Sequence, residues 1–79
     1  MKKRISIVTP CYNEVGNVAN LQLAVQNVMS ELPDYEYEHI FIDNCSEDGT
    51  QEVLRELAKQ DSRTLVIFNE RNFGFSRSS

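Results

Sequence analysis

Three short apolar runs along the chain alternate with two stretches of helical periodicity. The runs cover residues 5–9, the second half of 35–42, and 64–68, and they are rich in β-branched and aromatic side chains. Runs of this length and composition are typical of buried strands. Pro10 is expected to end the first strand, because proline cannot donate a ladder hydrogen bond.

The first stretch between the runs is predicted to be a helix with one apolar face. Its apolar side chains recur every three or four residues, which places them on one side of a helix facing the core. These positions are Val18, Leu21, Val25, Val28 and Leu32. Asn13 or Asn17 is suited to cap the start of this helix, and Pro33 ends it.

The second predicted helix follows residues 46–50. Its apolar face is formed by Val53, Leu54, Leu57 and Ala58. Asp48 or Thr50 is expected to be its N-cap. Asp48 and Gln51 also have the spacing of a capping box, in which two side chains bond backbone N–H groups of the first turn.

The order strand, helix, strand, helix, strand predicts an α/β fold. The strands are continuous apolar runs, which favours parallel strands covered by helices on both faces. Right-handed crossovers make successive strands neighbours, so we expect a three-layer βαβαβ unit with a parallel sheet in the order 3-2-1. The pattern breaks off at residues 73–79. Residues 1–79 are therefore interpreted as part of a larger domain, whose further strands would lie beside the first.

Composition and charge narrow the class of protein. The 79 residues are 41% hydrophobic and 25% charged, as in ordinary globular proteins. Eight basic and twelve acidic residues give a net charge of −4, which argues against nucleic acid as a partner because phosphate backbones bind clustered Lys and Arg. No stretch approaches the ~20 apolar residues that span a membrane. Cys11 and Cys45 are expected to be thiols, and the predicted location is the cytoplasm.

Polar side chains gather after each of the three strands. Ligands bind at the carboxyl ends of strands in parallel sheets, so these residues mark the expected site. They are Pro10, Cys11, Tyr12, Asn13 and Glu14 after the first strand, Asp43, Asn44, Ser46 and Asp48 after the second, and Asn69, Glu70, Arg71 and Asn72 after the third. An acid here can cap a helix, hold a metal or accept hydrogen bonds from a ligand. Capping is the simpler interpretation for Ser46 and Asp48, whereas Asp43 lies too far from the helix and is better explained by a ligand.

Two familiar binding loops are excluded. Aligning Gly49 with the glycine of an EF-hand puts Arg55 at the position of the bidentate glutamate, and arginine cannot ligate calcium. The three glycines form neither a Gly-x-Gly-x-x-Gly nor a Walker pattern. A nucleotide at this end of the sheet would have to be held by side chains.

Three motifs resemble those of a known family. The segments IVTPCYNE (residues 7–14), FIDNCSEDGT (residues 41–50) and RNFG (residues 71–74) are similar, in order and spacing, to the motifs of the family 2 glycosyltransferases. The third looks like that of the branch containing dolichol- and polyprenyl-phosphate sugar transferases. The resemblance implies that residues 1–79 form the N-terminal, nucleotide-sugar-binding part of a Rossmann-like GT-A domain.

The resemblance also implies roles for individual residues. Pro10, Tyr12 and Glu14 would line the nucleotide pocket. Asp43 would accept a hydrogen bond from a uracil or guanine N–H, since a carboxylate accepts but cannot donate. Asp48 would fix the loop that follows the second strand.

The match is not uniform along the motifs. Asn44 and Cys45 stand where the family more often has Asp and Gly. Asn44 keeps hydrogen-bonding capacity without the charge, and it stays among the expected nucleotide-binding residues. Arg71 would approach the pyrophosphate, with an ordinary surface arginine as the alternative.

The implied reaction is transfer of a sugar from a UDP- or GDP-sugar to an acceptor, a polyprenyl phosphate or a saccharide, in cell-wall or polysaccharide biosynthesis. Mg²⁺ or Mn²⁺ would stabilise the leaving diphosphate, and a carboxylate would deprotonate the acceptor. The family's Asp-x-Asp metal motif and its general base follow a further strand. No catalytic or metal-binding residue is therefore assigned within residues 1–79, and this fragment alone is expected to bind no metal and to be inactive. Two alternatives stay open: a receiver-like regulatory module and a non-catalytic α/β interaction module.

Overall fold

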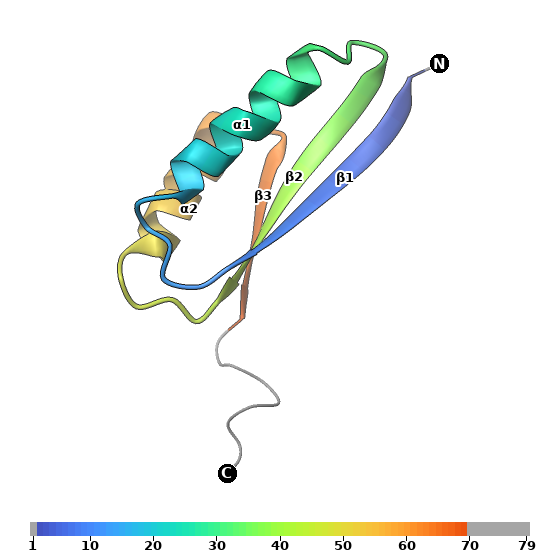
Figure 1. The fold of residues 1–79 in the computed structure, drawn as a ribbon. Coiled ribbons are helices and arrows are strands. Elements are labelled where there is room, and N and C mark those ends of the chain that lie inside the picture. The colour runs from blue at the N-terminus through green and yellow to red at the C-terminus, as the bar shows by residue number, and fades with distance from the viewer. Residues whose placement is uncertain (1, 70–79) are drawn as a thin grey trace.

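A computed structural model describes residues 2–69 of the chain, which form three strands and two helices (Figure 1). The elements are β1 (Lys3–Cys11), α1 (Val18–Ser30), β2 (Tyr35–Asn44), α2 (Thr50–Gln60) and β3 (Thr64–Asn69). All five predicted elements are confirmed. The strand β1 continues through Pro10, which was expected to end it. Among residues 2–69 β1 is an outer strand, where the missing N–H of proline is tolerated.

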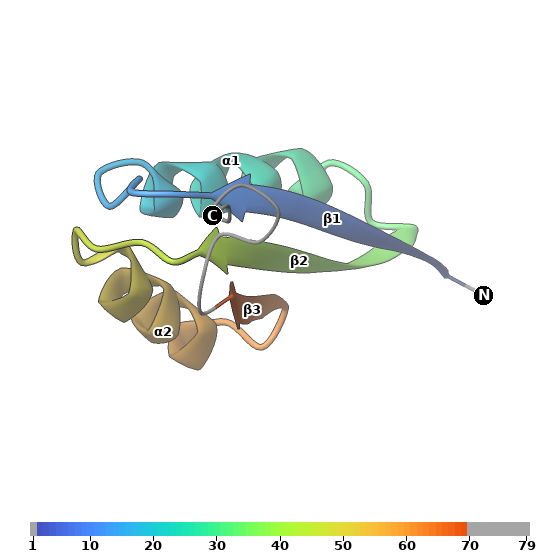
Figure 2. The ribbon, with the colours of Figure 1, turned by 90° about the horizontal axis from the view of Figure 1, so that it is seen from below.

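The sheet is parallel, with β2 between β1 and β3 (Figure 2). In its register, Cys11 lies beside Asp43, and Asn44 lies beside Asn69. The predicted strand order 3-2-1 is confirmed. Because all three strands run in one direction, their carboxyl ends meet at the same end of the sheet, called here the carboxyl end.

Both helices cover the same face of the sheet (Figure 1). The contact between them extends to β3, where the Gln22 amide of α1 donates to Thr64 Oγ1 at 2.8 Å. Two right-handed crossovers that step across a sheet in the same direction necessarily place their helices on one side. Residues 2–69 thus form two layers, and they do not supply the third layer of the prediction.

The core lies between the helices and the sheet. Its buried residues are Cys11, Val18, Phe41 and Leu54, with Leu21, Val53, Leu57, Val66 and Phe68 packed against them. Two predicted core positions are wrong, because Val28 is 60% exposed and Leu32 is 38% exposed. Gln22, which the apolar pattern did not include, is only 8% exposed. Its hydrogen bond to Thr64 satisfies the buried amide, so α1 turns this polar position toward the sheet.

The opposite face of the sheet is not covered by the described residues. Val8, Leu65 and Ile67 are about half-exposed there. Their neighbours in the strands alternate with them and point toward the helices, as side chains on successive strand residues must. The strands are therefore apolar on both faces, although only one face is packed by residues 2–69.

His39 is the one buried imidazole among the described residues. It is 1% exposed and lies on the helix-covered face of β2, with its ring 4.2 Å from that of Phe41. Its Nε2 shares a hydrogen bond of 2.9 Å with Thr9 Oγ1, while Nδ1 is buried without a partner. Burial lowers the pKa of His39.

Candidate functional site

Two loops lie side by side at the carboxyl end of the sheet. The first loop (residues 12–17) joins β1 to α1, and the second loop (residues 45–49) joins β2 to α2. Asn13 links them twice. Its backbone N–H donates to Ser46 Oγ at 2.8 Å, and its Oδ1 accepts the N–H of Glu47 at 2.8 Å.

Two further hydrogen bonds extend this link toward α2. The N–H of Glu14 donates to Thr50 Oγ1 at 3.0 Å, and the N–H of Val15 donates to Asp48 Oδ2 at 3.2 Å. Three consecutive N–H groups of the first loop are thus bonded to side chains that follow β2. Residues 33 to 36 positions apart in the sequence are held in one rigid arrangement by these four bonds.

The backbone of both loops enters the left-handed region. Asn13 has φ 51°, Cys45 has φ 63°, and Gly49, the N-cap of α2, has φ 94°. Asparagine tolerates this region better than most residues, and glycine adopts it without steric strain. Cysteine has a Cβ atom and is strained there. The left-handed backbone at position 45 would suit a glycine, and Cys45 adopts it with steric strain.

Asp43 is buried beneath the second loop. It is 0% exposed, and its Oδ2 accepts the N–H of Ser46 at 3.1 Å and the Gln51 amide at 2.9 Å. Its Oδ1 accepts the Ser46 hydroxyl. All three donors belong to the protein, so in this conformation a base reaches the carboxylate only if Ser46 or Gln51 moves. The expected contact between Asp43 and a base N–H stays a prediction.

Asp48 bonds to the start of α2 and to the first loop. Its Oδ1 accepts the N–H of Thr50 at 3.1 Å and also the Thr50 hydroxyl. The hydroxyl bond, together with the N–H groups of Val15 and Thr50, lowers the pKa of Asp48. The predicted capping box with Gln51 is wrong, because Gln51 bonds Asp43 and the N-cap is Gly49.

Glu14 and Asp43 lie at the same end of the sheet, as the strand order led us to expect. Besides burial, both carboxylates raise the pKa of the thiol of Cys11, which pairs with Asp43 in the register of β1 and β2. Burial is the main cause that raises the pKa of the Cys11 thiol to about 11, and the two negative charges add to it. Neither Cys11 nor Cys45 forms a disulfide, as expected.

The remaining predicted residues differ in how far the structure places them. Pro10 and Tyr12 are exposed at the carboxyl end. Asn44 is partly exposed, and its Oδ1 accepts the Asn69 amide at 2.8 Å. Arg71 lies outside the described residues. Asn69 was expected at this end from its place directly after the third apolar run, but the resemblance assigned it no role.

The acids of this site do not make a metal centre. Among residues 2–69, no group of three or more His, Cys, Asp or Glu side chains is arranged to hold a metal ion. The oxygens of Asp43 and Asp48 are already bonded to protein donors. A divalent cation therefore does not fit the described residues.

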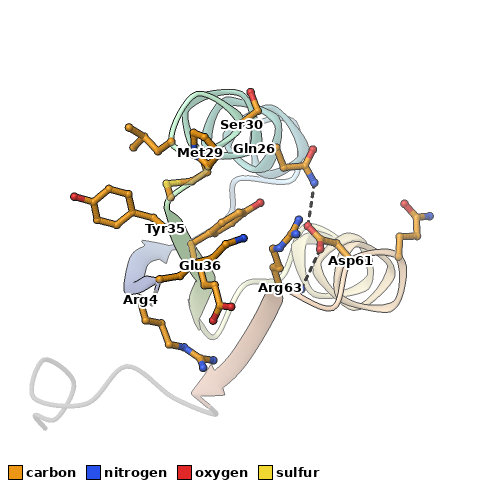
Figure 3. Close-up of a pocket in the computed structure, with 13 residues that line it drawn as sticks. Arg4, Gln26, Met29, Ser30, Tyr35, Glu36, Asp61 and Arg63 are labelled. Carbon is orange, nitrogen blue, oxygen red and sulfur yellow. Dashed lines mark hydrogen bonds between the residues drawn. The ribbon is translucent and has the colours of Figure 1, made fainter.

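A separate cavity of about 690 Å³ lies at the opposite end of the sheet (Figure 3). Its walls come from the end of α1, the start of β2 and the turn after α2. Figure 3 shows the Gln26 amide bonded to Asp61, at 3.0 Å. Basic and acidic side chains both line it, including Arg4, Arg63 and Glu36. None of the predicted site residues lies in this cavity.

The helices of residues 2–69 are too short or too polar to cross a membrane.

Comparisons with known proteins point to one family. A family model described as glycosyl transferase family 2 matches residues 6–79. The chain is 33% identical, over 92% of its length, to the protein named as a teichuronic acid biosynthesis glycosyltransferase, TuaG, of Bacillus subtilis strain 168. It is 32% identical over 95% of its length to the glycosyltransferase AglE of Haloferax volcanii. It is 34% identical over 90% of its length to a prophage bactoprenol glucosyl transferase homolog of Escherichia coli K12.

The chain is short compared with these relatives. It covers 27% of the length of TuaG, 27% of AglE and 23% of the bactoprenol glucosyl transferase homolog. The similarity thus concerns about a quarter of each relative. The residues matched by the family model include all three motifs of the sequence.

Proposed function

The chain belongs to glycosyl transferase family 2, and we propose that it forms the nucleotide-binding part of an enzyme that transfers a sugar from a nucleotide-sugar to an acceptor. The observation that supports this most is the set of hydrogen bonds between the two loops. They bring the first two motifs together at the carboxyl end of a parallel sheet, where such sheets bind ligands.

The side chains at this end suit a nucleoside. Tyr12 is half-exposed and offers a ring on which a base can stack. The Glu14 carboxylate, which accepts the Asn17 amide at 3.2 Å, has further lone pairs for ribose hydroxyl groups. Asp48 and Ser46 bond the first loop directly, and Asp43 bonds Ser46. These three residues contribute by holding the loops in place.

The proposal also covers the acceptor and the metal of the complete enzyme. The relatives named as bactoprenol glucosyl transferases support a polyprenyl phosphate acceptor, and TuaG, named for teichuronic acid biosynthesis, supports a saccharide. Mg²⁺ or Mn²⁺ would neutralise the leaving diphosphate in the complete enzyme. Its ligands would have to come from residues other than 2–69.

Isothermal titration calorimetry of the chain with UDP and with GDP tests the proposal. We expect weak binding, with Kd of about 1 mM or somewhat below, because only part of the ligand's surface can be contacted. Replacing Asp48 by Asn should weaken binding, since it disturbs the bond to Val15 that fixes the first loop.

Asp34→Asn is the matched control, because Asp34 is exposed in the turn before β2, at the far end of the sheet. The proposal predicts unchanged binding for this variant. Absence of heat for both nucleotides at millimolar concentration would contradict it and would favour a non-catalytic module. Equal weakening by both substitutions would contradict the role given to the bond between Asp48 and Val15, because Asp34 lies far from the proposed site.

A further inference from the structure

Asp43 and Asn44 are consecutive residues at the end of β2, and they lie on opposite faces of the sheet because strand side chains alternate. Asp43 is on the face covered by the helices, fully buried and bonded to Ser46 and Gln51. Asn44 is on the other face and is partly exposed. A ligand at the carboxyl end can therefore touch Asn44 without any rearrangement.

Asn69 holds the Asn44 side chain in a defined orientation. The two residues are partners in the register of β2 and β3, and Asn69 Nδ2 donates to Asn44 Oδ1 at 2.8 Å. Among the described residues, no other hydrogen bond uses Asn44 Nδ2 or Asn69 Oδ1. The amide pair thus keeps N–H donors on Asn44 and a carbonyl acceptor on Asn69 for a further partner.

We propose that Asn44 and Asn69 act together as an uncharged amide pair that contacts the base of the bound nucleotide, and that this pair accepts uracil and cytosine almost equally. The inference rests on the proposed function, because it concerns the same site. It assigns a specificity-determining role to Asn69 and separates the role of Asn44, contact with the ligand, from that of Asp43, support of the loop.

The chemistry follows from which groups donate and which accept. Uracil presents its N3–H donor beside carbonyl acceptors, and cytosine presents its N3 acceptor beside an amino donor. Each base can therefore give one hydrogen bond to Asn69 Oδ1 and receive one from Asn44 Nδ2. A carboxylate at position 44 could only accept, and it would face the lone pair of cytosine N3. The amide in this chain removes that discrimination.

Calorimetry of the chain with UDP and CDP tests this inference. For the natural sequence, the two Kd values should agree within about threefold, because both bases keep the same number of hydrogen bonds. Asn44→Asp should change the ratio in favour of UDP by about tenfold or more, since cytosine loses one bond and meets a negative charge. Asn69→Ala should weaken both nucleotides to a similar extent.

Asn27→Asp is the matched control, because it adds the same charge on the exposed surface of α1. It should leave the ratio unchanged. A second measurement needs no variant: the side-chain NH₂ signals of Asn44 and Asn69 in ¹H–¹⁵N spectra should shift when either nucleotide is added.

The possible results separate this inference from the proposed function. Binding of UDP with tenfold or greater preference over CDP in the natural sequence, or an unchanged ratio in Asn44→Asp, overturns the amide pair and leaves the nucleotide site standing. Binding without any shift of the Asn44 and Asn69 NH₂ signals does the same. If neither UDP nor CDP binds, the amide pair is refuted, and the proposed function is refuted with it only if GDP also fails to bind.

Discussion

Replacing Asp43 by Ala should destabilise the fold more than any other single change at the carboxyl end. The carboxylate is fully buried and accepts bonds from the Ser46 N–H, the Ser46 hydroxyl and the Gln51 amide. Alanine leaves these donors without an acceptor. The hydroxyl can rotate, but the Ser46 N–H is fixed by the backbone, and the Gln51 amide is only partly exposed.

The expected loss follows from one or two unsatisfied donors. Each unsatisfied buried donor costs about 1–3 kcal/mol, so one or two of them span about 1–6 kcal/mol, and the free energy of unfolding should fall by about 2–4 kcal/mol, the middle of that span. A 79-residue domain has a total stability of about 4–12 kcal/mol, so the change is a large fraction of the total. Asp43→Asn should cost only about 1 kcal/mol. Its amide oxygen can take the place of Oδ2, and its NH₂ can donate to Ser46 Oγ.

Urea unfolding followed by circular dichroism measures these differences. Asp34→Ala is the control, because it deletes the same group from an exposed turn and should change stability by no more than about 0.5 kcal/mol. A loss within that range for Asp43→Ala, or equal losses for Asn and Ala at position 43, would show that the three bonds to Asp43 do not stabilise the fold.

Three further predictions concern pH, backbone strain and thiol reactivity. Burial lowers the pKa of His39, so the unfolded chain takes up a proton that the folded chain does not. Stability should therefore decrease as the pH falls through the usual histidine pKa of about 6.5, and His39→Gln should flatten this slope in urea unfolding. The lowered pKa of Asp48 acts in a different window, because its contribution is present above about pH 4 and is lost below it. Gly49→Ala should lower the free energy of unfolding, measured in urea, by about 1 kcal/mol or more, because its φ of 94° disfavours a side chain; an added Cβ would meet Val15 Cγ2 only at an ordinary 3.7 Å. Gly16→Ala is the control and should cost nothing, because nothing lies within 4 Å of its added Cβ. Equal losses for the two variants would argue against backbone strain at Gly49. Cys11, buried and with a pKa of about 11, should resist iodoacetamide at pH 8 until urea unfolds the chain, and rapid labelling detected by mass spectrometry in the folded state would contradict its placement.

The sequence was sufficient for the elements, the parallel strands and their order, because apolar runs and crossover handedness depend on local pattern. It was insufficient where a tertiary contact decides the outcome. Gln22 is buried because its amide bonds Thr64, which lies 42 residues away in the sequence, on β3. The two-layer arrangement of residues 2–69 was also not predicted. Continuous apolar strands indicate that both faces of the sheet are apolar, but they do not show on which face the two helices lie.

The candidate site shows the same division. The motif residues of the first two loops were expected at one end of the sheet, and Glu14, Asp43 and Asp48 are found there. The direction of each side chain was not predicted. Asp43 and Asn44 point to opposite faces of the sheet, and a shift of one residue in the strand pairing would exchange them. The sequence alone therefore does not show which of the two faces a ligand. The Gln51 side chain likewise had two acidic partners within reach, and only the folded backbone selects Asp43.

The most direct test of the nucleotide site is a ¹H–¹⁵N titration of the labelled chain with UDP. We expect the backbone signals of residues 12–15 and 44–50 to shift together in a saturable manner, while those around Gln26 and Asp61 stay in place. Shifts confined to the cavity at the opposite end of the sheet, or no saturable shift at millimolar UDP, would contradict it.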